Sequence, residues 1–399
     1  AEAPDGEAPF SLPIVFTGTT PDGVTLAANI SARSPMVHTV EPLTPTTLAP
    51  MTRILATLYD GLVLRDVPGY VRLRSAARAQ ANATITALGG VVRYLAHQYR
   101  MNVIGVDVGA SSTTLAGATA SGEFLPALFS QGGVGPGAGY VLRATDANNL
   151  IRWIAATADE NMLREYAIHR MTRPRTLAAT ELELEIEHAF AREAIRMAMR
   201  GRGARLGGLN PIDLALSTGG VLSNVSHPAL AALILLDGLE PKGITSLALD
   251  VANLAGMLGS AAYLSPRIAA DVTDADALPL LIGPAVSLAG KPADGEPALR
   301  VTLQRGDGSE HTQEVAAGTI VRLPVRNGEQ VLLSLFPAAT VDAGLGMGQQ
   351  ARANEPIEGG ELGIIVDARG RPFAFPASPE ERIAKLLSWR RSLMGTGGH

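Results

Sequence analysis

One stretch, Val103-Ile-Gly-Val-Asp-Val-Gly-Ala-Ser-Ser-Thr-Thr-Leu-Ala-Gly-Ala-Thr119, constrains the fold of this chain more than any other. An apolar run leads to Asp107, a turn of small residues follows, and a second run of small and β-branched residues begins at Thr113. Two such runs around a Gly/Ser turn predict a β-hairpin. Its tip would carry one carboxylate, a glycine and several hydroxyl groups.

The tip of this hairpin has the chemistry of a phosphate site. Gly109 lets a ligand approach the backbone without a side chain in the way, and successive N–H groups of a turn can face an anion. Asp107 is suited to hold a hydrated Mg²⁺ beside that anion, because Mg²⁺ prefers oxygen ligands and keeps several waters. A tight hairpin with a well-placed aspartate explains the same residues without a ligand, so both interpretations stay open at this point.

Length and composition exclude several classes of function. A chain of 399 residues, 46% of them hydrophobic, predicts two or three domains with real cores. The net charge of −5 is small, and acidic and basic residues are both frequent, so we expect no nucleic-acid or acidic-membrane partner. The absence of cysteine excludes disulfides and thiolate chemistry. We find no signal-peptide pattern and no apolar run long enough to span a bilayer, and we expect a cytoplasmic protein.

By pattern, the chain divides into four regions. Residues 1–100 combine a polar, proline-rich start with helical periodicity, and residues 101–282 carry the hairpin and further helices. After residue 282, helical periodicity gives way to short β-rich runs separated by turns such as Arg326-Asn-Gly328, a strong hairpin signal. We therefore expect a separate all-β module over residues 283–376, followed by a C-terminal helix and tail over residues 377–399.

Local patterns in the first region predict individual elements. Residues 12–30 are typical of a strand, a turn at Thr20-Pro-Asp-Gly23 and a second strand. Residues 73–99 predict a long helix. Its interior Gly89-Gly90 pair indicates a break or the close approach of another helix, because each glycine costs about 1 kcal/mol relative to alanine.

In the second region, residues 212–217 predict a short buried strand that runs into Thr218-Gly219-Gly220. Such a run places bare backbone at the C-terminal end of a sheet, where ligands of α/β folds bind. A helix predicted over residues 246–262 presents Gly256 and Gly259 as a small-residue face suited to close helix packing.

The run Gln131-Gly-Gly-Val-Gly-Pro-Gly-Ala-Gly139 follows the predicted hairpin. It does not fit the dinucleotide-binding fingerprint, because no strand feeds directly into it. A glycine-rich lid over a phosphate and an ordinary solvent-exposed loop are both compatible with it. Elsewhere we find no phosphate-binding Gly-Lys-Ser/Thr loop, no Gly-x-Ser-x-Gly elbow and no paired histidines, which argues against hydrolases with a built-in nucleophile and against a zinc site.

Three motifs remain, and their order along the chain resembles the second lobe of the actin-like ATPase superfamily. They are Asp107-Val-Gly-Ala-Ser-Ser-Thr-Thr114, Leu216-Ser-Thr-Gly-Gly-Val221 and Leu249-Asp-Val-Ala-Asn-Leu-Ala-Gly-Met-Leu-Gly259. The first resembles the second phosphate loop of that superfamily, the next its adenosine motif, and the third its connecting helix. The nearest resemblance, from about residue 40 to 389, is to the MutL (GlmL) accessory proteins of adenosylcobalamin-dependent glutamate mutase. It includes the late run Gly363-Ile-Ile-Val-Asp-Ala-Arg-Gly-Arg-Pro372.

This resemblance implies an α/β fold: an actin-like (ribonuclease H-like) lobe with a partial or degenerate first lobe, plus the C-terminal all-β module. It implies ATP or ADP with Mg²⁺ as ligands. Asp107 would orient the Mg²⁺, through water, or the attacking water. The resemblance further assigns phosphate binding to the turn amides of Gly109, Ala110, Ser111 and Ser112, helped by Thr113, and it places Gly219 and Gly220 close to the adenosine.

The chain departs from the superfamily pattern in two ways. An earlier Asp-x-Gly phosphate loop is not found; the nearest candidate, Phe16-Thr-Gly-Thr-Thr-Pro-Asp-Gly23, lacks the leading aspartate. Either the chain is a fragment or its first lobe is degenerate. In the later loop, Ala110 replaces a glycine and Thr114 stands where the family has an aspartate. The loss of that carboxylate weakens the case for hydrolysis more than the case for nucleotide binding.

Three hypotheses of function follow. The first is an actin-like ATPase that reactivates a cobalamin-dependent mutase through nucleotide-driven closure of two lobes. The second is an inactive pseudo-ATPase that keeps the fold as a scaffold and docks a partner protein through its β module. The third is a small-molecule kinase of the same superfamily, for which the sequence offers no general base. Each is compatible with an oligomer.

Overall fold

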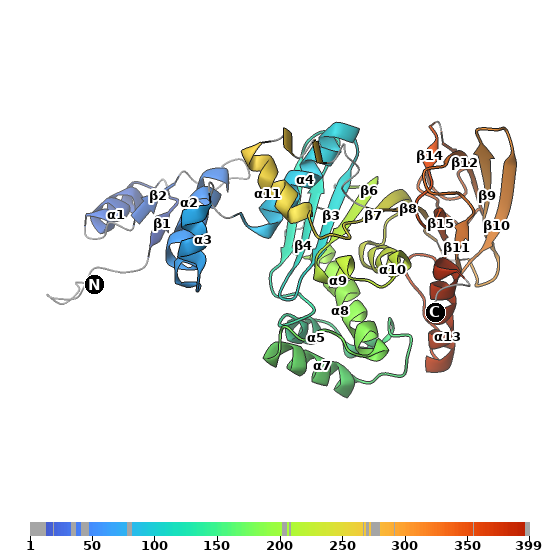
Figure 1. Cartoon of the computed structure of the whole chain (residues 1–399), viewed down its shortest axis with the longest axis horizontal. Helices are drawn as coiled ribbons and strands as arrows, with labels where there is room; N and C mark the ends of the chain where they lie inside the picture. Colours follow the sequence, from blue (N-terminus) through green and yellow to red (C-terminus); the bar gives the residue numbers. More distant parts are fainter. Residues whose placement is uncertain are drawn as a thin grey trace. The chain divides into compact units, whose positions relative to one another are not determined.

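The computed structural model describes residues 13–18, 20–32, 37–40, 48–77, 82–201, 206, 209–265, 267–268, 271–272, 280–290, 292–353 and 355–395. The chain forms two compact units, Ala1–Asn82 and Ala83–His399. This division differs from the boundary predicted at residue 100, because helix α4 (Thr84–Tyr99) packs on the sheet of the second unit. Figure 1 labels the elements of both units.

The first unit is small. Strands β1 (Ile14–Phe16) and β2 (Val37–Thr39) pair in parallel. Helix α1 (Pro21–Ser31) connects them in the chain. Helix α2 (Leu48–Leu62), a 3-10 turn (Leu64–Asp66) and helix α3 (Tyr70–Ala76) follow.

The predicted second strand in residues 12–30 is wrong, and Leu12 lies outside the described residues. Thr20 is the N-cap of α1, its Oγ1 accepts the Gly23 N–H at 3.3 Å, and Pro21 occupies the first turn. Threonine caps helices and proline is preorganised for their first position, so the same four residues begin a helix instead of a turn.

A mixed eight-stranded sheet forms the centre of the second unit, in the order β11-β15-β8-β7-β6-β3-β4-β5. Neighbours β3, β6 and β7 run parallel, and β3, β4 and β5 form an antiparallel meander that contains the predicted hairpin. The strand bounds are β3 Val103–Val108, β4 Thr113–Ala118, β5 Phe124–Phe129, β6 Leu214–Thr218, β7 Gly243–Leu249, β8 Leu280–Ser287, β11 Ile320–Leu323 and β15 Ile364–Asp367.

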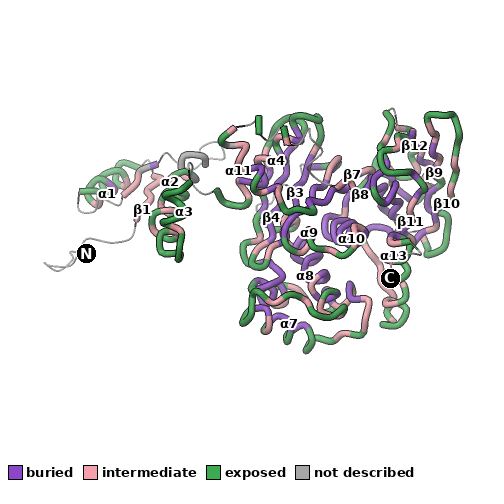
Figure 2. Tube along the Cα trace, viewed as in Figure 1, coloured by how far each residue is buried: buried purple, intermediate pink, exposed green. Residues whose placement is uncertain are grey.

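Both faces of this sheet are covered, which explains why β3 and β4 are apolar along almost their whole length. On one face, Val103 and Ala116 pack with helix α4 and helix α11 (Ala255–Leu264). On the other, Ile104 and Val106 pack with helix α8 (Glu181–Arg200) and helix α10 (Pro228–Leu239). Figure 2 shows strand β3 and helix α10 as largely buried.

Helices α4 and α11 touch through glycines. A Cβ on Gly259 would lie 1.7 Å from the Ala87 carbonyl oxygen, and one on Gly90 would lie 2.9 Å from the Gly259 carbonyl oxygen. Gly90 therefore marks a close helix approach inside an unbroken α4, whereas a Cβ on Gly89 would lie 2.6 Å from Cζ of Phe124 in β5. Both predicted helices begin later than expected: α4 starts at Thr84, and α11 at Ala255 because β7 extends through Leu249.

The C-terminal part contributes a separate antiparallel sheet, in the order β10-β9-β12-β13, with β14 also paired to β12. Its strands are β9 Pro297–Arg305, β10 Glu310–Ala316, β12 Gln330–Pro337, β13 Ala351–Arg352 and β14 Ile357–Glu358. The predicted α/β class with such a sheet is confirmed. Pairing crosses residue 282, however, since β8, β11 and β15 join the central sheet.

The Asn-Gly turn predicted as a hairpin connects β11 to β12, which belong to different sheets. Helix α13 (Pro379–Met394) packs on β11 and on α10. Helices α5 (Ala138–Ala144), α6 (Ala147–Ile151), α7 (Glu160–Thr172) and α9 (Gly220–Ser223) lie between β5 and α10 in the chain. None of the helices in the described ranges combines the length and apolar character needed to cross a bilayer.

A buried ion network ties the C-terminal strand β15 to the helices of the core. Asp367 accepts Arg369 Nε at 2.8 Å and Arg371 Nη2 at 2.6 Å. Arg369 also donates to Asp237 on α10 at 2.7 Å, and Asp237 accepts Arg192 Nε of α8 at 2.7 Å. Burial alone would raise the pKa of Asp367, but the two guanidinium groups lower it well below its usual range. The late Asp-Ala-Arg-Gly-Arg run thus has a structural role.

Replacement of Asp367 with Asn should destabilise the second unit by about 3–5 kcal/mol, because it leaves buried guanidinium charge without its partner. The measurement is urea unfolding followed by tryptophan fluorescence, which reports on the second unit because Trp153 and Trp389 are the only tryptophans. Glu160→Gln, which breaks the exposed Arg164–Glu160 pair, is the control and should change stability by less than about 0.5 kcal/mol. Equal effects of the two variants would contradict this assignment.

His188 gives the second unit a specific pH dependence. Burial, with Arg192 and Arg390 nearby, lowers the pKa of His188 to about 3 from the usual 6.5. Between these values the unfolded chain binds a proton that the folded chain does not, so stability falls as the pH drops below about 6.5, by up to about 1.4 kcal/mol per pH unit. His188→Gln should flatten the urea midpoint between pH 6.5 and 4.5, whereas His97→Gln on the exposed side of α4 should not.

Candidate functional site

The C-terminal ends of three parallel strands meet at one edge of the central sheet. Asp107 in β3 lies opposite Thr218, the last residue of β6, and Ser217 lies opposite Leu249, the last residue of β7. Asp250 follows directly after β7. In α/β sheets with parallel strands this edge is where ligands bind. The structure therefore brings Asp107, the 109–112 turn and Gly219 together at this edge.

Asp107 is half-buried on the face of the sheet that α4 covers, since Gly105, two residues earlier, packs against Val92 and Leu88. Burial raises the pKa of Asp107, and no hydrogen bond from the described residues offsets it. A carboxylate that is partly desolvated and has no donor is suited to a cation or a bound water.

Gly219 makes room for this carboxylate. A Cβ at Gly219 would lie 2.2 Å from Asp107 Oδ1 and 2.8 Å from the Val108 backbone nitrogen, and the residue has φ of +91°. Both the space and the backbone conformation therefore require glycine. Gly220, the first residue of α9, is exposed and has open space where a Cβ would be.

Two polar residues after β7 hold Gly219 in place. The Thr218 hydroxyl donates to Asp250 Oδ2 at 2.9 Å, and Asn253 Oδ1 accepts the Gly219 N–H at 3.1 Å. Asp250 also accepts the N–H groups of Leu254 and Ala255 at the start of α11, at 3.0 and 2.7 Å.

Sequence reasoning placed Asp250 and Asn253 in the third motif but gave them no role. The available signal was an Asp and an Asn directly after an apolar run and before a helix, which is a helix-start pattern.

The turn between β3 and β4 presents free backbone donors. The Gly109 N–H donates to the Ser112 carbonyl at 2.9 Å. The N–H groups of Ala110, Ser111 and Ser112 have no acceptor within the described part of the chain. Three consecutive N–H groups without an acceptor on a half-exposed turn of small residues are suited to an anion.

Thr113 is turned away from this surface. Its side chain is fully buried, and its hydroxyl donates to the Gly132 carbonyl at 2.7 Å. Thr114 is also buried and pairs with Asp107 across the hairpin, so no second carboxylate stands beside Asp107 there.

The glycine-rich loop (residues 131–139) is neither a lid nor a solvent-exposed loop. Gly132, Gly133, Val134 and Gly135 are buried. The loop packs against the back of the turn, where the Val134 N–H donates to the Gly109 carbonyl at 3.2 Å and the Gly135 N–H to the Ala110 carbonyl at 2.7 Å.

The donor set at this edge fits a hydrated Mg²⁺ but not a metal held by protein ligands alone. Among the described residues, no three His, Cys, Asp or Glu side chains gather where they could hold a metal ion. Asp107 would therefore contribute the protein's carboxylate, and water and phosphate oxygens the rest, which is the usual preference of Mg²⁺. In the first unit, the run over residues 16–23 has the sequence most similar to a further phosphate loop. In the structure, Phe16 ends β1 and Thr20 caps α1.

A family model described as MutL protein matches residues 7–277. The chain belongs to the MutL family. The predicted resemblance is therefore confirmed at the level of the family. No curated protein matches the sequence.

Solved structures similar to this MutL chain include several proteins of the actin-like ATPase fold. Component A of the (R)-2-hydroxyglutaryl-CoA dehydratase of Acidaminococcus fermentans is 13% identical, with 50% of this chain and 74% of that chain covered and a TM-score of 0.29. The activator of the 2-hydroxyisocaproyl-CoA dehydratase of Clostridium difficile, with bound ADPNP, is 13% identical over 59% and 86%, with a TM-score of 0.28. MreB 5 of Spiroplasma citri, bound to AMPPNP, is 11% identical over 66% and 80%, with a TM-score of 0.25.

The contact between Gly219 and Asp107 can be tested directly. Gly219→Ala should lower the free energy of unfolding by about 1–3 kcal/mol, because the new Cβ meets Asp107 and the Val108 backbone at a positive φ. Gly220→Ala is the matched control and should change stability by less than about 0.5 kcal/mol, since its Cβ enters open space. Urea unfolding compares the two variants, and a well-tolerated Gly219→Ala would contradict the close packing at this edge.

Proposed function

We propose that the edge formed by β3, β6 and β7 binds ATP or ADP together with Mg²⁺. The observation that carries this proposal is the half-buried Asp107 carboxylate, without a donor in the described chain, beside a turn with three free N–H groups. MutL family membership supports it, because the motifs that build this edge are those that resemble the nucleotide motifs of actin-like ATPases.

Each residue has a distinct part in the proposal. The N–H groups of Ala110, Ser111 and Ser112 bind phosphate oxygens, and Gly109 lets the phosphate approach. Thr113 contributes through the Gly132 carbonyl that it holds. Gly219 and Gly220 offer bare backbone to the adenosine side of the nucleotide.

Asp107 orients the hydrated cation, or an attacking water, beside the phosphates. The Mg²⁺ would supply neutralisation of phosphate charge, which is its usual contribution to phosphoryl transfer. Catalysis of phosphoryl transfer depends on positioning and electrostatics, so the main contribution of the protein would be the fixed position of the Asp107 carboxylate at the end of β3.

The residues at this edge favour binding of ATP or ADP more than hydrolysis of ATP. Asp250, the other carboxylate at this edge, already accepts the Thr218 hydroxyl and two N–H groups of α11. Thr114 occupies the position beside Asp107 where the superfamily has an acid. These two observations favour the pseudo-ATPase scaffold as a second candidate alongside an ATPase.

For the biological role, we propose that the chain acts as an accessory protein of an adenosylcobalamin-dependent mutase. MutL family membership supports a role of this kind. The separate antiparallel sheet (β9, β10, β12, β13 and β14) is the proposed docking surface for the mutase, because its strands are not part of the central sheet that carries the proposed nucleotide site.

Isothermal titration calorimetry with Mg-ATP and Mg-ADP tests nucleotide binding. Asp107→Asn keeps the shape of the side chain and removes its charge, so the Mg-nucleotide affinity should fall about tenfold, or about 1.4 kcal/mol. In excess EDTA the order should reverse, because the native carboxylate then repels the phosphates of the free nucleotide.

Asp213→Asn is the control for this experiment. Asp213 lies just before β6, at the opposite end of the strands, where it accepts the Asn102 N–H at 2.7 Å. Its replacement should leave the affinity unchanged. An unaltered protein that binds neither nucleotide would remove the proposal. Phosphate release from ATP that depends on Asp107 would decide for an ATPase over a scaffold.

A further inference from the structure

The turn that carries the free N–H groups is oriented by the glycine-rich loop behind it. The Gly109 carbonyl accepts the Val134 N–H at 3.2 Å, and the Ala110 carbonyl accepts the N–H groups of Gly135 and Gly137 at 2.7 and 3.2 Å. The peptide bonds of this turn are trans. In a trans peptide, the C=O and the following N–H point in opposite directions. The loop therefore directs the N–H groups of Ala110 and Ser111 away from itself, toward the open side.

This contact is made by backbone against backbone, which explains the glycines of the loop. A Cβ on Gly133 would lie 2.3 Å from the Ala110 carbonyl oxygen, and one on Gly137 would lie 2.7 Å from the Ser111 carbonyl oxygen. The glycines thus serve close approach, and any side chain at these two positions would push the loop off the turn.

Two side-chain hydroxyl groups hold the glycine-rich loop in place. One belongs to Thr113 of β4, which donates to the Gly132 carbonyl. The other belongs to Tyr166 of α7, which donates to the Val134 carbonyl at 3.0 Å. Tyr166 is only 6% exposed; its ring stacks on Phe190, with ring centroids 5.2 Å apart, and the Arg170 guanidinium lies 5.1 Å from the ring centre.

The Tyr166 hydroxyl begins a chain of aligned peptide dipoles. It donates to the C=O of the peptide between Val134 and Gly135, whose N–H donates to the C=O of the peptide between Ala110 and Ser111. The N–H of that second peptide is the free Ser111 donor. Successive hydrogen bonds of this kind polarise one another. Burial raises the pKa of Tyr166, so the hydroxyl keeps its proton.

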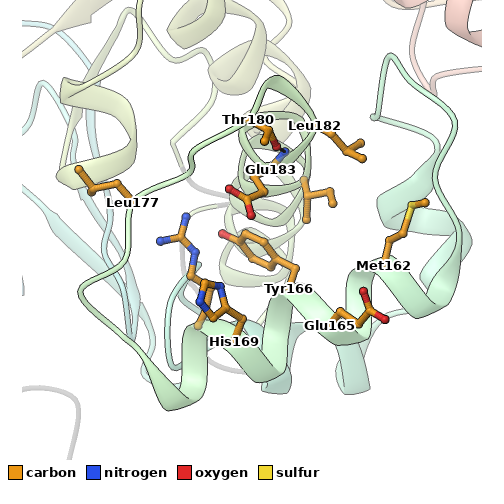
Figure 3. Close-up of a pocket in the computed structure, with 10 residues that line it drawn as sticks. Met162, Glu165, Tyr166, His169, Leu177, Thr180, Leu182 and Glu183 are labelled. Atoms are coloured by element: carbon orange, nitrogen blue, oxygen red, sulfur yellow. Dashed lines mark hydrogen bonds between the residues drawn. The ribbon is translucent and has the colours of Figure 1, made fainter.

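We infer that Tyr166 is a positioning residue for phosphate binding, acting on the Ser111 N–H through the glycine-rich loop. The inference rests on the proposed function, namely that this turn binds the phosphates of a nucleotide. Tyr166 also borders a cavity of about 370 Å³ between α7 and the start of α8, where Figure 3 shows Glu183 and His169 nearby. A phenylalanine would keep the buried ring and its stacking on Phe190, so loss of the hydroxyl is not expected to disturb the packing of α7.

Tyr166→Phe removes the first donor of the chain and keeps the ring. Its affinity for Mg-ATP should fall three- to tenfold, while its affinity for adenosine, which has no phosphate, stays unchanged. In a ¹⁵N-resolved spectrum, the amide signals of Ser111 and Gly135 should move relative to the unaltered protein. Tyr140→Phe is the matched control, because Tyr140 is 38% exposed on α5 and packs edge-on against Phe129. It should bind both ligands like the unaltered protein.

The second anchor of the loop provides an independent variant pair. Thr113→Val removes the donor to Gly132, and Thr113→Ser keeps it. The same split between Mg-ATP and adenosine is expected for Thr113→Val, with recovery in Thr113→Ser. This pair decides the matter where Tyr166→Phe unfolds.

The outcomes separate the inference from the proposed function. If the unaltered protein binds no Mg-ATP, the proposed function itself fails. If it binds Mg-ATP and both Tyr166→Phe and Thr113→Val bind it equally well, the positioning role is overturned while the nucleotide site stands. A loss of the same size for Mg-ATP and adenosine would also overturn it, because it would show a general structural effect.

Discussion

Parallel pairing among β3, β6 and β7 is the constraint on which the candidate site depends. The register sets Asp107 opposite Thr218 and Ser217 opposite Leu249, so the three strands end together. Because side chains alternate along a strand, a slip of one residue would move Asp107 to the face covered by α8 and α10. The apolar residues that fill both faces of the sheet oppose such a slip. The core therefore determines where the carboxylate of the site stands.

The parts of this arrangement that are local in sequence could be predicted, and the parts that depend on distant pairing could not. The hairpin that carries Asp107 follows from two adjacent runs and a turn of small residues. The bond that Asp250 accepts from Thr218 does not, because this donor lies 32 residues earlier in the chain. The start of α1 is unpredictable for a different reason: Thr20-Pro-Asp-Gly23 suits both a turn and a helix cap, and the sequence contains no local feature that separates the two.

Glycine-rich segments are ambiguous in sequence, because a flexible backbone and close packing of two backbones require the same residue. The loop over residues 131–139 has the composition of a mobile lid, yet Gly133 and Gly137 are needed where backbone touches the turn. Gly90 and Gly259 serve two helices in the same way. In each case the reason for glycine is the atom that would meet a Cβ. That atom belongs to a segment brought near only by the fold.

Asp107 and the adjacent 109–112 turn favour ligands of opposite charge. Burial raises the pKa of Asp107, and a nearby cation would stabilise its charged form. The N–H groups of Ala110 and Ser111 have no acceptor among the described residues, so they favour an anion. A bare phosphate satisfies the amides but is repelled by the carboxylate. A cation alone satisfies the carboxylate and leaves the amides free. A phosphate group that brings its own divalent cation satisfies both at once, which is the electrostatic basis of the proposed binding of a metal–nucleotide complex.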